Sequence, residues 1–254
     1  MKKTLPFLVL FFFAGCSKEK YFDGPDSYAD DFEQYYTAAD LFRDDESRWS
    51  YAQVTNTSNS ITIDSTIAHS GSKCARFFAK SSGSNVSKCS IAKQHMAFYE
   101  GETVHMTCWY YLEGTARADW MFLFDIEEQA AIGAGPGTRI ALTGDSGDAV
   151  VEHKFPNPNI YQAAGQEISF PRSQWVKLEM EIKLSQKKKG YVKVWQNDRL
   201  ILDRGNWKTL PKDLLYFQQG TKVMYTSIEF GITANTRDND MVLYLDDVDV
   251  KCIQ

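Results

Sequence analysis

The stretch "WVKLEMEIKLSQKKKGYVKVWQND", Trp175 to Asp198, alternates apolar and polar residues on both sides of a short polar interruption. Alternation with a period of two is typical of β-strands that bury one face and expose the other. The triplet 187–189, followed by Gly190, is typical of a solvated turn. The stretch therefore predicts a β-hairpin with one apolar face.

The same alternation recurs along most of the chain, and turn signals such as "GDSGD" and "DND" separate the segments. Helical pattern is confined to residues 28–42 and 210–220, each of which is expected to form a turn or two. So many strands require two packed sheets. The expectation is an all-β antiparallel sandwich or jelly roll with few short helices, formed as one domain by residues 28–254.

The N-terminus "MKKTLPFLVLFFFAGC" has a basic start, an apolar run and small residues before Cys16. This pattern is typical of a secretory signal that is too short to span a bilayer as a helix. It resembles a bacterial lipoprotein signal with the lipobox "FAGC". The resemblance implies that residues 1–15 are removed, that Cys16 is lipidated, and that 16–27 form a lipidated tether to the outer membrane, on its cell-surface or periplasmic face. Ordinary secretion or an uncleaved anchor is the alternative.

The charge balance argues against nucleic acid as a partner. The 254 residues carry a formal net charge of -5, and the sequence pI is about 5.5. Outside the triplet 187–189 the chain has no basic cluster, which nucleic-acid binding would require.

Four cysteines remain after Cys16, an even number for an oxidising compartment. Four cysteines allow three pairings. We favour Cys74 with Cys89, because their segments flank the turn-like "SSGSN" as a hairpin would, and Cys108 with Cys252 by elimination. Buried free thiols are the alternative, and the absence of CxxC or HxxxH spacing argues against a zinc site.

The segment "PRSQWVKLEMEIKLSQKKKGYVKVWQNDRLILDRGN", residues 171–206, resembles the concanavalin A-like jelly rolls. Its "W..L.....S....G...VW.N" spacing is similar to that of the polysaccharide lyases related to heparin lyase I. The segments "DDFE", "AHSGSKCARF" and "LYLDDVDV" fit the same group and also resemble jelly-roll carbohydrate-binding modules. The resemblance implies a fold that serves lyases, glucanases, lectins and binding modules alike.

The strand "WMFLFDIEEQ", residues 120–129, is predicted to place Leu123, Asp125 and Glu127 on one face, and Phe122 with Phe124 on the other. In jelly-roll lyases the similar strand carries Gln and His, and carboxylates there would repel an acidic polymer. Retaining glucanases of this fold carry E-x-D-x-E, which Leu123 interrupts, although the spacing suits a carboxylate pair. The lyase pattern "YFK.G.Y" also lacks its lysine in "YFQQGTKVMY".

These departures favour polysaccharide binding in a jelly-roll groove over cleavage. Aromatic rings stack on sugars while charged and amide groups fix the hydroxyls. A lyase that cleaves a uronate-containing glycan is the alternative, followed by a glycoside hydrolase and by a structural lipoprotein that assists outer-membrane glycan-uptake proteins. The predicted glycan-binding residues are Asp125, Glu127, Arg139, His153, Tyr161, Tyr191 and Trp195. The predicted catalytic residues, if the protein is a lyase, are His153, Arg139, Tyr161 and Lys154.

The resemblance also implies a structural calcium ion. Its predicted ligands are Asp31 or Glu33 near the first strand and Asp246 or Asp247 near the last, completed by the turn 69–72. Oxygen ligands suit calcium rather than zinc. The alternative is that these acids lie in solvent at the ends of strands.

Overall fold

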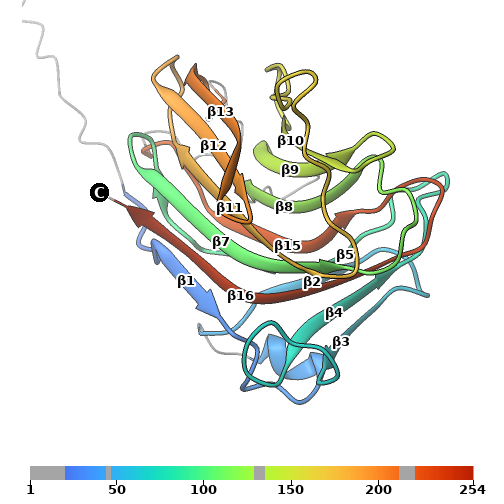
Figure 1. Ribbon diagram of the computed structural model, residues 1–254. Helices are drawn as coiled ribbons and strands as arrows, with labels where there is room; N and C mark the ends of the chain where they lie inside the picture. The colour runs from blue at the N-terminus through green and yellow to red at the C-terminus, as the bar shows by residue number, and fades with distance from the viewer. Residues whose placement is uncertain (1–20, 44–46, 129–134, 212–220, 254) are drawn as a thin grey trace, which may run out of the picture.

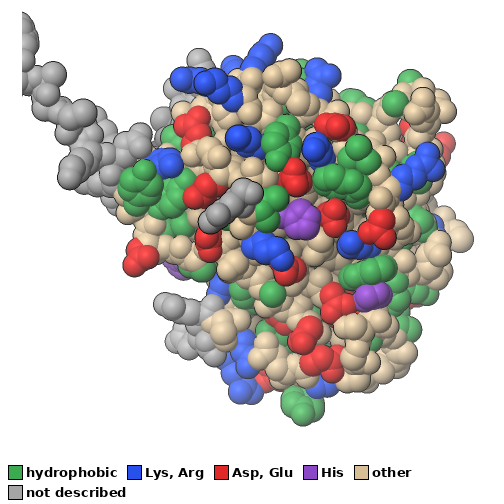
Figure 2. Space-filling model, turned by 60° about the vertical axis from the view of Figure 1, so that its left-hand side comes forward, with side chains coloured by type: hydrophobic (Ala, Val, Ile, Leu, Met, Phe, Trp, Pro, Cys, Tyr) green, Lys and Arg blue, Asp and Glu red, His purple; other side chains and the backbone are tan. Residues whose placement is uncertain are grey.

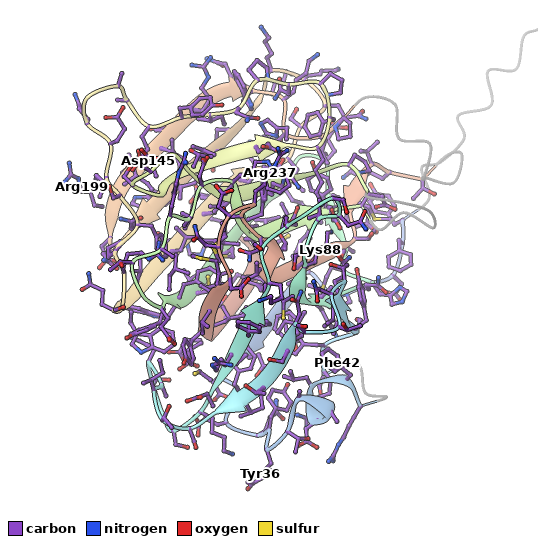
Figure 3. The ribbon with its side chains drawn as sticks, turned by 90° about the vertical axis from the view of Figure 1, so that its right-hand side faces the viewer. Tyr36, Phe42, Lys88, Asp145, Arg199 and Arg237 are labelled. Atoms are coloured by element: carbon purple, nitrogen blue, oxygen red, sulfur yellow. The ribbon has the colours of Figure 1, made fainter. Side chains whose placement is uncertain are left out.

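The computed structural model describes residues 21–43, 47–128, 135–211 and 221–253. Within these ranges the chain is almost all β, with two large antiparallel sheets packed as a sandwich (Figure 1). A short 3-10 helix, Ala38–Phe42, lies in the first segment where helical pattern was predicted, and the second such segment falls largely outside the described residues. Figure 3 shows Phe42 at the end of this helix and Tyr36 pointing into solvent. The predicted all-β sandwich is confirmed.

The larger sheet has eight strands and contains the hairpin predicted from residues 175–198. Gln196 pairs with Leu178, and Tyr191 pairs with Lys183. Asn197 and Asp198 connect this hairpin to the next strand of the sheet, and both have positive φ, as the two-residue turn of a second hairpin requires. The strand order is β13 (Arg199–Trp207), β12 (Gly190–Gln196), β11 (Trp175–Lys183), β7 (Thr103–Leu112), β16 (Met241–Ile253), β4 (Cys74–Ala79) and β3 (Ser60–Asp64), with β1 (Ser27–Asp30) paired to β16.

The second sheet has six strands and packs its apolar face against the first. In β7 and β11 every second residue is buried, as alternation predicts, whereas β8 and β15 are buried on both faces. The strand order is β10 (Asp148–His153), β9 (Gly137–Thr143), β8 (Met121–Glu127), β15 (Ser227–Ala234), β5 (Cys89–Lys93) and β2 (Tyr51–Val54); β14 (Met224–Tyr225) and β6 (Phe98–Tyr99) form a separate pair.

A bulge in β8 breaks the alternation that the sequence predicted. The pairing of β8 with β9 shifts register between Phe122 and Phe124. Leu123 and Phe124 both belong to the core between the sheets, while Phe122 joins a separate apolar cluster. The prediction that Leu123 shares a face with Asp125 and Glu127 was therefore wrong, because the extra residue of a bulge reverses the parity of the residues after it.

The predicted disulfides are not formed, and the four cysteines of the described chain are free thiols. Cys74 lies on β4 and Cys89 on β5, which belong to different sheets rather than to one hairpin. Cys252 pairs with Val104, four positions along β7 from Cys108. Four residues of a strand span about 13 Å, well beyond the roughly 7 Å that a disulfide can bridge.

The predicted signal and residues 16–20 of the tether, Cys16 included, lie outside the described residues. Among the described residues no helix is long and apolar enough to cross a membrane.

Candidate functional site

One row of side chains crosses the outward face of the six-stranded sheet, which is the face turned away from the other sheet. Each member pairs by register with the next, so all of them point to the same side. Asp125 and Glu229, in the middle, are each only 1% exposed, so this face is recessed. We call it the polar row; from β10 to β2 it consists of Glu152, Arg139, Asp125, Glu229, Ala92 and Tyr51.

Lys154, which follows β10, contacts two acids of β8. Its Nζ lies 2.8 Å from Asp125 Oδ1, an ion pair without directional hydrogen-bond geometry, and it also donates to Glu127 Oε2. Gly137 lies close against Glu127, and a Cβ there would be only 2.5 Å from the Cβ of Glu127. The backbone N–H of Lys154 donates to the Gly137 carbonyl and fixes the lysine at the sheet edge. One ammonium group thus serves two nearly buried carboxylates.

Burial and mutual repulsion separate the acidities of the three carboxyls. Burial raises the pKa of Asp125. The positive charges of Lys154 and Arg139 lower this pKa by a larger amount, so the net shift is downward. Burial and the neighbouring Asp125 raise the pKa of Glu127. The same two causes raise the pKa of Glu229 to about 7. Carboxyls whose pKa values are pushed apart in this way are typical of catalytic sites.

Lys154 stays an ammonium in this setting. Burial lowers its pKa, but the charges of Asp125 and Glu127 raise it by more, and the net shift is upward. It is therefore a fixed positive charge and a poor base at neutral pH.

Glu229 has one satisfied and one unsatisfied oxygen. Its Oε1 accepts a hydrogen bond from Ser90 Oγ on β5. Its Oε2 is buried and has no hydrogen-bond partner within the described chain. A buried polar atom without a partner is costly unless it serves a ligand.

Tyr51 stands at the β2 end of the row. Gln53 Nε2 donates to its phenol oxygen at 3.2 Å, and Lys88, labelled in Figure 3, donates to Gln53 Oε1 at 2.8 Å. The small Ala92 lies between Tyr51 and Glu229 in the row. These two side chains are therefore two strand spacings apart, about 9.6 Å, with a methyl group between them. Ala92 is itself fully buried, so this part of the row is covered, and its methyl group offers no polar partner to either neighbour.

The far end of the same face is apolar. Phe122 packs with Ala141, Val150 and Ala234, and the partly buried Trp120 lies edge-on to it with ring centroids 5.0 Å apart. The Arg139 guanidinium lies 3.8 Å from the Phe122 ring centre and pairs with Glu152. An aromatic surface beside ionisable groups is what a sugar polymer requires.

The structure brings together four of the predicted residues, namely Asp125, Glu127, Arg139 and Lys154. His153 is not with them, because it faces the core on the opposite side of β10. Its ring contacts Thr138 at 3.0 Å and accepts a hydrogen bond from Trp207 at 2.8 Å. Burial lowers the pKa of His153 to about 4, so it is a neutral structural residue.

The predicted aromatic groove residues do not join the cluster either. Tyr191 and Trp195 share a face, as their spacing predicts, but that face is the outward side of the eight-stranded sheet, where they pair with Lys183 and Glu179. Their placement in one groove with Asp125 was wrong, because β12 belongs to the other sheet. Tyr161 follows an isolated bridge to β10 and is 64% exposed.

The predicted calcium ligands bind the backbone instead. Glu33 Oε1 accepts from the amides of Ser72 and Lys73, and Asp246 Oδ2 accepts from those of His69 and Ser70. These N–H donors occupy the oxygens that a cation would need. Asp31 is exposed and bonds the amide of Glu33.

No group of three or more His, Cys, Asp or Glu in the described ranges could hold a metal ion. The residues as placed do not fit calcium, and the ion stays a prediction.

Sequence reasoning missed Glu229, Tyr51, Ser90 and Glu152. Glu229 had a usable signal, since it is a single acid inside the otherwise apolar "SIEFGITAN". Tyr51 had none, because "YAQV" is too short to predict as a strand. Their association depends on pairings between strands far apart in sequence.

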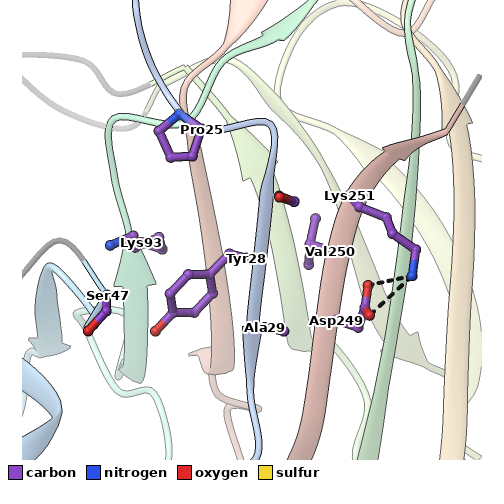
Figure 4. A pocket seen from close by; sticks show the side chains of 9 residues that line it. Pro25, Tyr28, Ala29, Ser47, Lys93, Asp249, Val250 and Lys251 are labelled. Carbon is purple, nitrogen blue, oxygen red and sulfur yellow. Dashed lines mark hydrogen bonds and ion pairs between the residues drawn. The ribbon is translucent and has the colours of Figure 1, made fainter.

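A separate pocket of about 490 Å³ lies between β1, β5 and β16 (Figure 4). Its charged groups are engaged with protein atoms. Lys251 pairs with Asp249, and Lys93 donates to the Arg48 carbonyl and lies 5.0 Å from the ring centre of Tyr28. These contacts indicate a structural role.

Solved structures with the same fold include two lyases that act on polysaccharides and a cellulose-induced protein. The endo-β-1,4-glucuronan lyase of the fungus Trichoderma reesei matches with a TM-score of 0.63 at 14% identity, covering 81% of this chain and 91% of that one. The cellulose-induced protein Cip1 matches with 0.60 at 15% identity, covering 87% and 95%. Alginate lyase Aly36B matches with 0.57 at 12% identity, covering 91% and 99%. These likenesses establish the fold.

Comparison of sequences supplies the family. No curated protein sequence matches the chain. The family model described as polysaccharide lyase matches residues 43–249, a span that includes every member of the polar row. The chain therefore belongs to the polysaccharide lyase family.

Proposed function

We propose that this protein cleaves a uronate-containing polysaccharide by β-elimination, with the polar row as its active site. The observation that carries the proposal is the gathering of buried ionisable groups with shifted pKa values on one recessed face, in a member of the polysaccharide lyase family. This reverses the preference for binding alone that the sequence suggested. The acids that argued against a lyase, Asp125 and Glu127, are paired with Lys154, and Arg139 also lowers the pKa of Asp125.

The reaction requires three groups. A base removes the ring proton next to the uronate carboxylate, an acid protonates the leaving oxygen, and a third group offsets the negative charge that develops on the carboxylate. The electron pair of the broken C–H bond forms the new double bond, while the bond between the neighbouring ring carbon and the leaving glycosidic oxygen breaks.

Glu127 is the proposed base. Its raised pKa makes the ionised carboxylate a stronger base than an exposed glutamate. Lys154, bonded to it, provides a positive charge beside the reacting ring.

Tyr51 is the proposed acid. Burial raises its pKa and Gln53 lowers it, and the net shift is upward, so the phenol keeps its proton at neutral pH. In this role it gives that proton to the leaving oxygen. The apolar end of the face, with the partly buried Trp120, would hold a neighbouring sugar by stacking.

The test is incubation of the protein with glucuronan, alginate and glycosaminoglycans while the absorbance of unsaturated uronides is followed. The similar solved enzymes are a glucuronan lyase and an alginate lyase, which places these two polymers first. We expect absorbance to grow with at least one polymer and Glu127→Gln to reduce the rate by about 100-fold or more. A panel without unsaturated product, combined with retention of a glycan, would establish the binding function instead. Reducing ends without unsaturation would indicate a glycoside hydrolase.

We further propose that the protein works outside the cytoplasm, held on the outer membrane through Cys16. The support is the signal-like sequence "MKKTLPFLVLFFFAGC". Cys16→Ser should release the protein from the membrane fraction, and glycan-uptake proteins are the partners to seek by co-purification. A Cys16→Ser protein that stays membrane-bound contradicts the anchor.

A further inference from the structure

We propose that Glu229 is the residue that recognises the uronate carboxylate, and that it does so as a neutral carboxylic acid that donates a hydrogen bond. This inference rests on the proposed function, because it assigns the substrate-charge-neutralising role within the same site. It makes the protein selective for sugars that carry a carboxylate.

The geometry leaves one oxygen of Glu229 for a ligand. Its Oε1 accepts from Ser90, so the carboxyl is fixed on one side. Its Oε2 is buried without a hydrogen-bond partner in the described chain. The neighbour toward Tyr51 is the fully buried Ala92, whose methyl group offers no hydrogen-bond partner on that side of the row. A substrate carboxylate that reaches Oε2 would supply the hydrogen-bond partner that this oxygen lacks.

The surroundings favour the protonated form. From β8, Asp125 and Glu127 both raise the pKa of Glu229, and the nearby Lys88, which precedes β5, lowers it. Tyr51 on β2 is a neutral phenol, and Lys154 is committed to the two carboxylates of β8. Two negative neighbours and 1% exposure disfavour a third charge at this place.

A bound substrate carboxylate strengthens the preference of Glu229 for its protonated form. Its negative charge next to Glu229 repels the ionised form and accepts a hydrogen bond from the neutral form. Uptake of one proton is thus linked to binding. Well above a pKa of about 7, the affinity for a uronate should fall about tenfold for each pH step of one.

Glutamine provides a matched control, because its amide donates a similar hydrogen bond but does not titrate. Glu229→Gln should bind uronate oligosaccharides with an affinity that stays nearly constant between about pH 6 and 9. Glu229→Leu should bind them weakly at every pH, since it has no donor. The neutral cello-oligosaccharides should show no comparable pH dependence with any of the three proteins.

The experiment is titration calorimetry of the full chain with glucuronan and alginate oligosaccharides across this pH range, with KM measured for any polymer that is cleaved. Loss of wild-type affinity above pH 7, with Glu229→Gln resistant, supports the assignment. Wild-type affinity without pH dependence, or a Glu229→Gln protein as weak as Glu229→Leu, overturns it. Absence of unsaturated product would count against the proposed lyase activity, while the calorimetric comparison still decides whether Glu229 binds the carboxylate.

Discussion

The outward faces of the two sheets carry the same kinds of charged residue but in different surroundings. On the eight-stranded sheet, Lys177 lies 3.3 Å from Glu179 and 2.9 Å from Asp198, and the Lys177 side chain is 28% exposed. On the six-stranded sheet, Lys154 and Asp125 have side chains 10% and 1% exposed. Figure 2, which brings forward the left-hand side of Figure 1, shows acidic and basic side chains interspersed in the open. Burial, rather than residue type, distinguishes the candidate site.

The physical reason is the screening of charge by water. An exposed ion pair gains little because water solvates both partners well. Groups that have lost their water interact strongly and change one another's proton affinity. The recessed face can therefore hold proton donors and acceptors whose pKa values suit neutral pH. On the exposed face, water screens the charges from one another.

The largest expected effect is the loss of the buried cation. Lys154→Met leaves Asp125 and Glu127 buried without their partner, and should lower the free energy of unfolding by about 3 to 5 kcal/mol. The matched change Lys177→Met, on the exposed face, should cost no more than about 1 kcal/mol. Urea unfolding of both variants measures the difference. Equal losses would show that burial does not separate the two faces.

The second effect is on catalysis. Tyr51→Phe keeps the ring but removes the proton that the leaving oxygen needs, so kcat should fall roughly 100-fold to 10,000-fold. Tyr191→Phe, on the outward face of the other sheet, serves as the control and should leave kcat unchanged. Initial rates on a cleaved polymer measure both. A Tyr51→Phe enzyme with normal kcat would remove Tyr51 from the mechanism.

The third effect is a pH dependence of stability. The folded pKa of Glu229, about 7, lies above its ordinary value of 4.5, so the folded state keeps a proton that the unfolded state has lost. The resulting stability is fully present below about pH 4.5 and is lost as the pH rises through 7, by about 3 kcal/mol in total. Glu229→Gln should lack this loss. If the free energy of unfolding changed with pH in the same way for the two proteins from pH 4 to about pH 8, the raised pKa would be contradicted.

The smallest effect concerns His153. His153→Phe removes the acceptor for the Trp207 N–H and the contact with Thr138, and should cost about 1 to 3 kcal/mol of stability. Because the ring faces the core, kcat at a temperature where the variant is folded should be unchanged. A large fall in kcat without loss of stability would return His153 to the candidate site.

The sequence by itself determined the strands, their apolar faces and the acidic strand that contains Asp125 and Glu127. Period-two alternation is a local property, and it predicted the sandwich and the hairpin of residues 175–198 before any contact was known. The spacing also placed Tyr191 and Trp195 on a common face.

Only the tertiary structure decided which of these residues meet. Glu229 is about a hundred positions from Asp125 in the chain, and the two face each other because β15 pairs with β8. The bulge in β8 sets which side the acids take, and the sheet to which β12 belongs removes Trp195 from the site. Alternation specifies that a strand has two faces, but strand order and register specify its neighbours and how much water reaches them.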